Sequence, residues 1–398
     1  MLETGKLVLE IIESSGGEAR FVGGCVRDFL KNEPIKDVDI ATNLQPEIIT
    51  KIFESRGFTI IPTGIRFGTI TLLFNNFGYE ITTLRKDLKC YGRHADVEFS
   101  SSFEEDSNRR DFTFNALYLD RKGNIYDFHN GRDDLEKGIV RFIGSPDERI
   151  KEDYLRILRL FRFQARYGKQ PILENQLQAC KENISGLANI SGERIHEEMK
   201  KILTNPNSLN AIKEMRGCNV LKQITGLENN FFDFASLENY FKISKNNIDW
   251  IASLVALLSL EEVIKHLIKI KKIVTNFKLS NAEKAFFYRI WDSLKIDFSK
   301  EFEVKRLLRS SVLNEFKQFA YIAFAKKFID ENSLQKILHL AENFSPPVFP
   351  LNGLDLMNEL KMKPSKELGE LLRKFEELWE QENYQLTKDD MINIIRQN

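Results

Sequence analysis

The spacing of apolar residues divides the chain into an N-terminal third of mixed structure and a helical remainder. Residues 4–14 carry apolar positions at helical spacing, and Gly16 and Gly17 end this predicted helix. Short β-rich runs follow, separated by turn pairs such as Asn75-Asn76. We expect strands at 19–22, 38–41, 69–74, 79–84, 97–99, 114–120 and 125–127, and a helix at 47–56 that Pro46 opens. These elements predict a small sheet that ends near residue 135.

From Lys151 onward the apolar positions follow a helical period. In EDYLRILRLFRFQARY, residues Leu155, Leu158 and Phe161 fall on one broad stripe. The helix IHEEMKKILTN is stopped by Pro206, and further helical segments continue to the end of the chain. The fold class expected is therefore α+β, with a small mixed β-sheet followed by helices alone.

Composition and charge narrow the possible classes of function. The 398 residues have a formal net charge of zero, so a polyanion would have to be bound by a local basic patch. The four cysteines form no CxxC pair, so we expect neither structural zinc nor a disulfide framework. The N-terminus predicts an amphipathic helix, and the longest apolar stretches are too short for a membrane span. We expect a cytoplasmic protein without a membrane partner.

Two aspartates, Asp37 and Asp39, interrupt the β-branched run KDVDIAT. At i and i+2 on a strand they point to the same face, where two like charges repel each other. A divalent cation removes that cost, and Mg²⁺ prefers a few carboxylates together with waters and substrate phosphates. The pair predicts a phosphoryl-transfer site, and an exposed edge or a turn cap is the alternative. Glu80, at the start of YEITTL, is the candidate for a third carboxylate facing them.

Gly23 and Gly24 lie between an apolar run and a short helix that carries Arg27. A strand, a glycine turn and a helix N-terminus together form an anion site. Arg27, on the first turn of that helix, is placed to reach a phosphate. The Asp-x-Asp motif that begins ten residues after Arg27 strengthens the prediction beyond what two glycines support.

Arginines recur at every third residue after Glu152 and Asp153. Arg156, Arg159 and Arg162 form a slowly turning stripe on a helix, for which a solvated face with acid–base pairs is the alternative. Because apolar residues bury the rest of this helix, we expect the arginines to face a cleft. If Asp153 and Arg156 face a base, the carboxylate accepts from an amino group and the guanidinium donates to a ring nitrogen. Cytosine and adenine both offer that pattern, whereas uracil and guanine do not.

Six blocks in this order resemble the signature blocks of the class II tRNA nucleotidyltransferases, the CCA-adding enzymes, and of their bacterial poly(A) polymerase relatives. They are FVGGCVRD, KDVDIAT, RRDFTFNAL, YDFHNGRDDL, EDYLRILRLFRF and ERIHEEMKKIL. PLNGLDLMNELKMKPSKELGELL is a looser match near the end. The resemblance implies a polymerase β-like nucleotidyltransferase head at 1–135, then a helical neck at 136–207, a body at 208–270 and a tail at 271–398, in a seahorse shape.

The resemblance also implies the activity and the roles of residues. The family adds C, C and A to the tRNA 3′ end from CTP and ATP without a nucleic-acid template, and two Mg²⁺ ions are expected. Asp37 and Asp39 match the metal-binding carboxylates, with Glu80 as a further catalytic candidate. The expected nucleotide contacts are Gly23, Gly24, Arg27, Arg110, Asp153, Arg156, Arg159 and Arg162. Glu193, Arg194 and Glu197 match the last block, which is interpreted as structural support of the neck.

Four related activities share such a head: CCA addition, CC-only addition, A-only addition and poly(A) synthesis. CC-adding relatives lack much of the loop that this chain carries from Arg85 to His94. In this flexible loop, Arg85, Lys86, Asp87 and Arg93 are candidates for a lever that switches the pocket from C to A. The poly(A) polymerases carry a longer basic insert, which is not found here, so CCA addition is favoured. The intact carboxylate pair disfavours an inactive RNA-binding protein on the same scaffold.

RNA contacts are expected in locally basic segments, IKHLIKIKKIVTNFK and VKRLLRS. We expect Lys269, Lys271 and Lys272 to meet phosphates of the tRNA acceptor stem and TψC arm. The alternative is that lysine stems cover apolar helix surface while their charged ends stay in water. No obligate protein partner is predicted.

Overall fold

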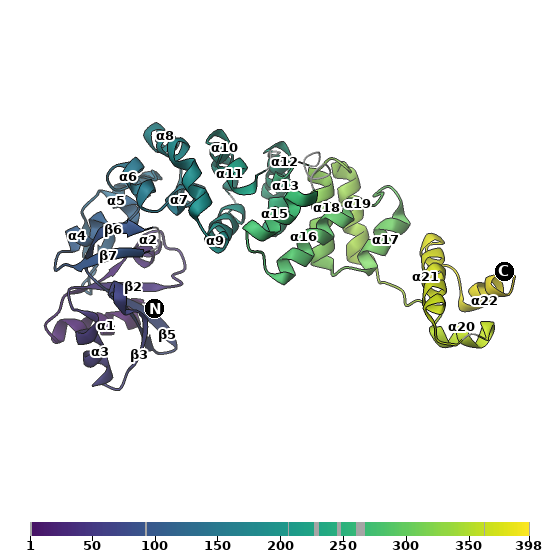
Figure 1. Ribbon diagram of the computed structural model, residues 1–398, viewed down its shortest axis with the longest axis horizontal. Helices are drawn as coiled ribbons and strands as arrows, with labels where there is room; N and C mark the ends of the chain where they lie inside the picture. Colours follow the sequence, from purple (N-terminus) through teal and green to yellow (C-terminus); the bar gives the residue numbers. More distant parts are fainter. Residues whose placement is uncertain are drawn as a thin grey trace. The chain divides into compact units, whose positions relative to one another are not determined.

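The computed structural model describes residues 2–91, 94–205, 207–226, 231–244, 248–259, 267–361 and 363–397. The chain divides into two compact units (Figure 1). The first unit comprises Met1–Glu228 and Ile268–Lys278, and the second comprises Asn229–Leu267 and Leu279–Asn398. The division into head, neck, body and tail stays a prediction.

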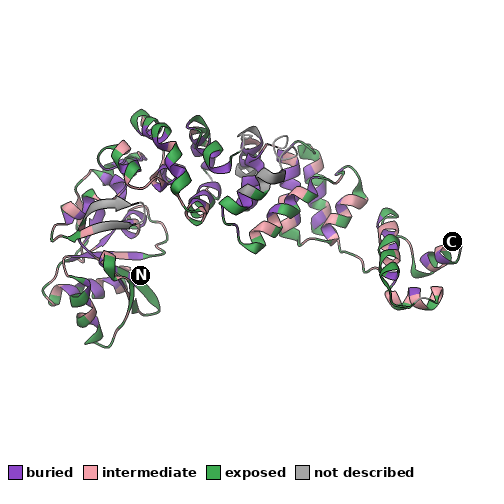
Figure 2. Cartoon of the chain, viewed as in Figure 1, coloured by how far each residue is buried: buried purple, intermediate pink, exposed green. Residues whose placement is uncertain are grey.

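The first unit begins with a seven-stranded mixed sheet of order β3-β4-β5-β2-β1-β8-β9. Its strands are β1 (Ala19–Val22), β2 (Val38–Thr42), β3 (Thr59–Gly64), β4 (Thr69–Phe74), β5 (Phe77–Thr83), β8 (Leu117–Leu119) and β9 (Ile125–Asp127). β2 and β5 run parallel, while the other pairs are antiparallel. Helices α1 (Leu2–Ser14) and α3 (Pro46–Glu54) pack against strands of this sheet. Figure 2 shows that buried and exposed residues alternate along the helices, and β1 and β2 are mostly buried whereas β3 is mostly exposed.

Most strands lie where the sequence predicts them, and the α+β fold class is confirmed. Three predictions are wrong in detail. β3 was not predicted, because Pro62 interrupts its apolar run. Of the predicted strand 114–120, only Leu117–Leu119 is a strand, and Thr113–Asn115 is a 3₁₀ turn. The described residues of the predicted loop from Arg85 to His94 belong to a two-stranded antiparallel sheet, in which β6 is Arg85–Tyr91 and β7 is His94–Phe99.

The rest of the first unit is helical. After α2 (Gly24–Leu30), α4 (Phe103–Asn108) and α5 (Gly131–Lys137) come α6 (Pro146–Glu152), α7 (Leu155–Tyr167), α8 (Glu174–Asn183), α9 (Gly192–Leu203), α10 (Ser208–Gly217), α11 (Val220–Thr225) and α15 (Leu267–Asn276). An aromatic cluster fixes α7 against the segments that carry Phe112 and Phe142. The Phe112 ring stacks on Phe142 at a centroid distance of 4.6 Å and meets Phe163 of α7 edge-on at 5.2 Å. Helix α7 is therefore held against the segment that carries Phe112 and its neighbour Asp111, the partner of Arg159.

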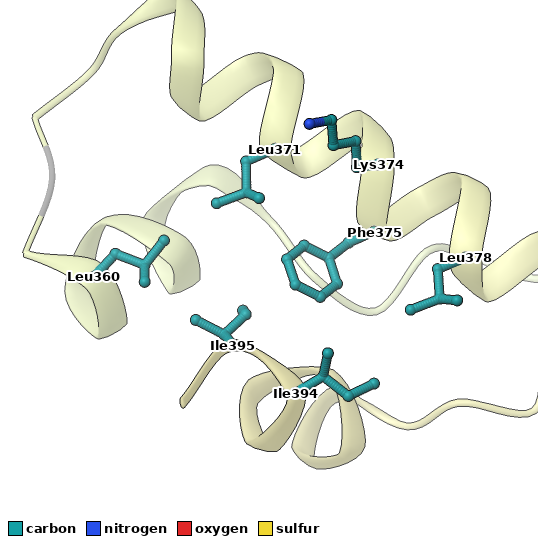
Figure 3. Close-up of a pocket in the computed structure, with 7 residues that line it drawn as sticks. All are labelled: Leu360, Leu371, Lys374, Phe375, Leu378, Ile394 and Ile395. Atoms are coloured by element: carbon teal, nitrogen blue, oxygen red, sulfur yellow. The ribbon is translucent and has the colours of Figure 1, made fainter. Parts of the chain in front are cut away.

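The described part of the second unit is helical. Its elements are α12 (Phe231–Ser244), α13 (Trp250–Leu257), α16 (Asn281–Ser293), α17 (Glu301–Arg309), α18 (Leu313–Ala325), α19 (Glu331–Asn343), α20 (Gly353–Leu360), α21 (Lys366–Gln381) and α22 (Lys388–Gln397). The last three surround an apolar pocket of about 440 Å³ between Leu360, Phe375 and Ile395 (Figure 3). Among the described residues, no helix has the length and apolar character needed to cross a membrane.

Candidate functional site

Two carboxylates are register partners on the parallel pair of β2 and β5, and a third directly precedes β2. Asp39 is the register partner of Glu80, so both side chains leave the sheet on the same face, and Asp37 lies two residues before Asp39. The pKa of Asp39 is raised to about 6, chiefly by burial. The negative charges of Glu80 and Asp37 also raise this pKa, whereas the guanidinium groups of Arg110 and Arg27 lower it. The structure therefore brings together the three carboxylates that the sequence predicts.

The carboxylates are chemically suited to Mg²⁺. Their oxygens are hard ligands, and the raised pKa of Asp39 reflects its burial first and the charges of Glu80 and Asp37 second. Among the residues that the structure describes, no group of three or more His, Cys, Asp or Glu side chains is arranged to hold a metal ion by itself. An ion bound by Asp37 and Asp39 would therefore take its remaining ligands from water and substrate phosphates.

The glycine turn between β1 and α2 lies directly against this site. Gly23 has a φ of +73°, which favours glycine. A Cβ atom on Gly23 would lie 3.4 Å from Nη1 of Arg110 and 3.9 Å from Oδ2 of Asp39. Gly24 begins α2, as expected. The turn thus places backbone next to one carboxylate and one guanidinium group.

Arg27 is buried and held on two sides. Its Nη1 donates to Oδ1 of Asn115 at 2.6 Å, and its Nε donates to Oδ1 of Asp28 at 2.9 Å. Asn115 in turn donates to Oδ1 of Asp111 at 2.9 Å, and Asp111 accepts from Nε of Arg159 at 2.6 Å. A continuous chain of hydrogen bonds therefore joins Arg27 on α2 to Arg159 on α7.

Arg110 is positioned by a residue that the sequence does not single out. Its Nε and Nη2 donate to Oδ2 of Asp106 at 3.2 and 3.0 Å, and Asp106 also accepts from Arg109 and from the hydroxyl of Tyr118. Burial acts to raise the pKa of Asp106, but the two guanidinium groups and the hydroxyl outweigh it and hold the pKa well below its usual range. Asp106 therefore fixes Arg110 as a charged group.

Each of the three α7 arginines that the sequence singles out is paired with an acid. Arg156 binds Glu152, and its Nη1 donates to the carbonyl of Arg149 at 2.8 Å. Arg159 binds Asp111, and Nη1 of Arg162 donates to Oε1 of Glu198 on α9 at 2.8 Å. Asp111 and Glu198 are buried and come from other elements. The side chains of Arg156, Arg159 and Arg162 are 12%, 29% and 14% exposed, so they are largely buried, and the cleft that they are expected to face stays a prediction.

Asp153 does not lie on the helix of the arginines. It is the C-terminal cap of α6, in an extended conformation with φ −152° and ψ 104°, and α7 begins two residues later. The expectation of one continuous helix through residues 152–162 is therefore wrong. The Asp153 carboxylate accepts from Nη2 and Nη1 of Arg194 at 2.6 and 3.2 Å and from the Leu155 backbone N–H at 3.2 Å.

The remaining candidates lie on β6 and α15. Arg85 donates from Nη1 to the carbonyl of Phe67, and Nζ of Lys86 lies 2.7 Å from Oε1 of Glu105. Lys271 is exposed on α15. The side chains of Asp87, Arg93, Lys269 and Lys272 lie outside the described residues.

Sequence reasoning missed Asp106, Asn115 and Asp111, which hold the arginines. Asp111 and Asn115 are polar residues inside the largely apolar run DFTFNAL, which was the available signal. Arg194 was identified as structural support, but its contact with Asp153 could not be predicted, because the two residues are 41 positions apart.

Comparison with known proteins links this arrangement to a family. Residues 19–141 match the family model described as the poly A polymerase head domain, and residues 172–227 match the model of a probable RNA and SrmB- binding site of polymerase A. The mitochondrial CCA tRNA nucleotidyltransferase 1 of Mus musculus is 34% identical over 98% of this chain and 89% of its own length. The CCA-adding enzyme of Ligilactobacillus salivarius is 34% identical over 93% of this chain and 90% of its own.

Solved structures of CCA-adding enzymes have the same fold as this chain. The Bacillus stearothermophilus CCA-adding enzyme in complex with CTP is similar with a TM-score of 0.74 at 25% identity, covering 100% of this chain and 97% of its own. The Thermotoga maritima CCA-adding enzyme, solved with tRNA, shares the fold with a TM-score of 0.67 at 22% identity, covering 93% of this chain and 89% of its own.

Proposed function

Because this chain belongs to the CCA-adding tRNA nucleotidyltransferases, we propose that it adds C, C and A to the 3′ end of tRNA from CTP and ATP, releasing pyrophosphate. The observation that carries the proposal is the pairing of Asp39 with Glu80, next to Asp37 and the glycine turn. Carboxylates that raise one another's pKa in this way are costly to ionise together unless cations or a cation-bound substrate neutralise them.

The reaction is an attack of the RNA 3′ oxygen on the α-phosphorus of the nucleotide. The new P–O bond forms as the bond from the α-phosphorus to the bridging β-phosphate oxygen breaks, pyrophosphate leaves, and the hydroxyl proton passes to solvent. Two Mg²⁺ ions at Asp37 and Asp39 would lower the pKa of the 3′ hydroxyl and neutralise the charge of the departing pyrophosphate. Glu80 adds negative charge that strengthens the attraction of Asp39 for cations.

The arginines bind and orient the triphosphate. Arg110 presents Nη1 toward the Gly23 turn while Asp106 holds its other nitrogens, so its orientation is fixed before the substrate arrives. Arg27 is locked by Asn115 and Asp28 and contributes positive potential behind the turn. Preorganised charge of this kind stabilises the transition state without reorientation of side chains during the reaction.

Base selection falls to Asp153 and Arg156. The carboxylate accepts from the amino group of cytosine or adenine, and the guanidinium donates to the neighbouring ring nitrogen. With uracil or guanine, the carboxylate meets a carbonyl oxygen and the guanidinium meets an N–H, so both contacts become repulsive.

The remaining assignments concern the RNA and the location. Lys271, exposed on α15, supports a phosphate contact with the acceptor stem or TψC arm. We propose a cytoplasmic location, which fractionation of the source cells would test against the mitochondrial location that the name of the murine relative records.

Replacing Asp39 tests the proposal most simply. Purified wild-type protein, Asp39→Ala and the control Asp133→Ala are incubated with Mg²⁺, labelled CTP and tRNA ending at the discriminator base. Asp133 is exposed on α5 and pairs only with Lys137 in the hydrogen bonds described. We expect wild type and Asp133→Ala to incorporate C. For Asp39→Ala we expect no incorporation of labelled C above the level measured without protein. A folded Asp39→Ala protein that retains C incorporation contradicts the proposal.

A further inference from the structure

We infer that Arg194 is a positioning residue that sets nucleotide specificity by orienting the carboxylate of Asp153. This inference rests on the proposed function, since it gives Arg194 a role in the base selection assigned above. The two nitrogens of one guanidinium group lie 2.6 and 3.2 Å from the two oxygens of Asp153. Such a bidentate pair fixes both the position and the rotation of a carboxylate.

Asp153 depends on this contact because its own backbone does little to orient it. The residue lies in the break between α6 and α7, with extended φ and ψ angles. In the hydrogen bonds described, its side chain is otherwise held only by the Leu155 backbone N–H at 3.2 Å. Arg156 has separate partners, Glu152 and the Arg149 carbonyl. The two base-reading side chains are therefore oriented independently, and Arg194 orients the carboxylate.

The count of acceptor sites explains how this contact produces selectivity. An ionised carboxylate offers about four lone-pair sites. Arg194 takes two of them and the Leu155 N–H takes a third, so roughly one site is left for a base. A single fixed acceptor matches the amino group of cytosine or adenine and repels the carbonyl oxygen of uracil or guanine. A carboxylate free to rotate could turn away from that oxygen and would lose the repulsion.

Helix α9 is itself held rigidly, so Arg194 arrives in a fixed place. Met199 and Ile202 of α9 are fully buried, and α9 packs along α7. At its N-terminus, a Cβ atom on Gly192 would lie 1.9 Å from the carbonyl oxygen of Asn276, so only glycine fits there. Nδ1 of His196 lies 3.1 Å from the carbonyl oxygen of Phe277.

The same helix also presents an acid to the arginines of α7. Glu198, four residues after Arg194, lies on the same face of α9 and binds Arg162. Helix α9 thus offers a cation to the base-reading aspartate and an anion to the last arginine of the stripe. Both contacts are made to residues that are assigned to nucleotide binding, Asp153 and Arg162. Helix α9 therefore does more than stabilise the fold.

The test compares the first nucleotide addition with CTP and with UTP in four proteins. These are wild type, Arg194→Met, Arg194→Lys and Lys201→Met, each with tRNA ending at the discriminator base. Lys201 is exposed on the same helix, and its Nζ lies 4.0 Å from exposed Glu197, so its replacement removes the same charge without touching Asp153. We expect Arg194→Met to lower the CTP-over-UTP ratio of kcat/KM by at least about tenfold.

The controls separate a specificity role from general loosening. Arg194→Lys keeps the charge but not the bidentate geometry, so its ratio should fall between wild type and Arg194→Met, and Lys201→Met should match wild type. If Arg194→Met does not fold, the ratio of Arg194→Lys decides. A folded variant with lower kcat/KM for both nucleotides and an unchanged ratio overturns the role of Arg194. Wild-type protein that adds no C overturns the proposed function and this inference with it.

Discussion

Asp39 on β2 and Glu80 on β5 are register partners in a parallel strand pair, and the charge of Glu80 helps to raise the pKa of Asp39 to about 6. Two carboxylates in this arrangement increase each other's attraction for a cation. Glu80 should therefore affect how tightly the site binds Mg²⁺, as well as the pKa of Asp39.

Glu80→Gln should therefore shift the Mg²⁺ requirement. The amide keeps the shape of the side chain but removes one negative charge, so we expect half-maximal activity to need about 10- to 100-fold more Mg²⁺. The measurement is the rate of C addition over a Mg²⁺ titration. A folded variant with the wild-type Mg²⁺ dependence would remove Glu80 from the site.

Asp106→Asn should destabilise the protein in a pH-dependent way. The pKa of Asp106 is lower in the folded protein than in the unfolded chain. Above the unfolded-state pKa, the ionised carboxylate therefore adds to the free energy of unfolding. This contribution is lost as the pH falls toward the folded-state pKa. Since the side chain is 1% exposed and paired, we expect a loss of about 3 kcal/mol at pH 7 that narrows below about pH 4.

Denaturant unfolding of wild type, Asp106→Asn and the exposed control Asp133→Asn between pH 3 and pH 8 checks this expectation. A difference between wild type and Asp106→Asn that stays constant over the whole range would contradict the assigned role of the ion pairs.

Asn115→Ala should weaken nucleotide binding without changing base selection. It removes the acceptor of Arg27 and a donor to Asp111, so the guanidinium groups of Arg27 and Arg159 lose their fixed orientation. We expect KM to rise about tenfold for both CTP and ATP. The CTP-over-UTP ratio should stay unchanged, because these residues contact no base edge. A change in that ratio would place the chain of hydrogen bonds in base recognition.

Charge reversal at Lys269, Lys271 and Lys272 should raise the KM for tRNA and flatten its salt dependence. Each lost phosphate contact lowers the slope of log affinity against log salt by about 0.9 on a duplex. Steady-state assays at several salt concentrations measure the slope, with the nucleotide KM as the internal control. An unchanged slope would exclude this patch from the RNA contact surface.

Local patterns in the sequence predicted the elements that position the carboxylates. The β-branched run around Asp39 specifies a strand, which begins at Val38, directly after Asp37. The glycine turn and α2 were equally predictable, since Gly23 requires its positive φ at that point.

Contacts between distant residues could not be predicted in the same way. The segment from Glu152 to Arg162 has an unbroken helical pattern with no glycine or proline, yet the helix ends at Glu152 and restarts at Leu155. The pairing of Asp153 with Arg194 accompanies the break, so tertiary contacts override local propensity there. Asp106 and Asn115 likewise gain their roles only when the chain folds.

Sequencing of the RNA 3′ ends tests the central claim most directly. Wild-type protein is incubated with Mg²⁺ and tRNA ending at the discriminator base, with CTP alone, with ATP alone and with both. We expect CC with CTP alone, essentially no addition with ATP alone, and CCA with both nucleotides, followed by a stop. A product that ends at CC with both nucleotides present, or that continues into a run of A, would contradict this claim.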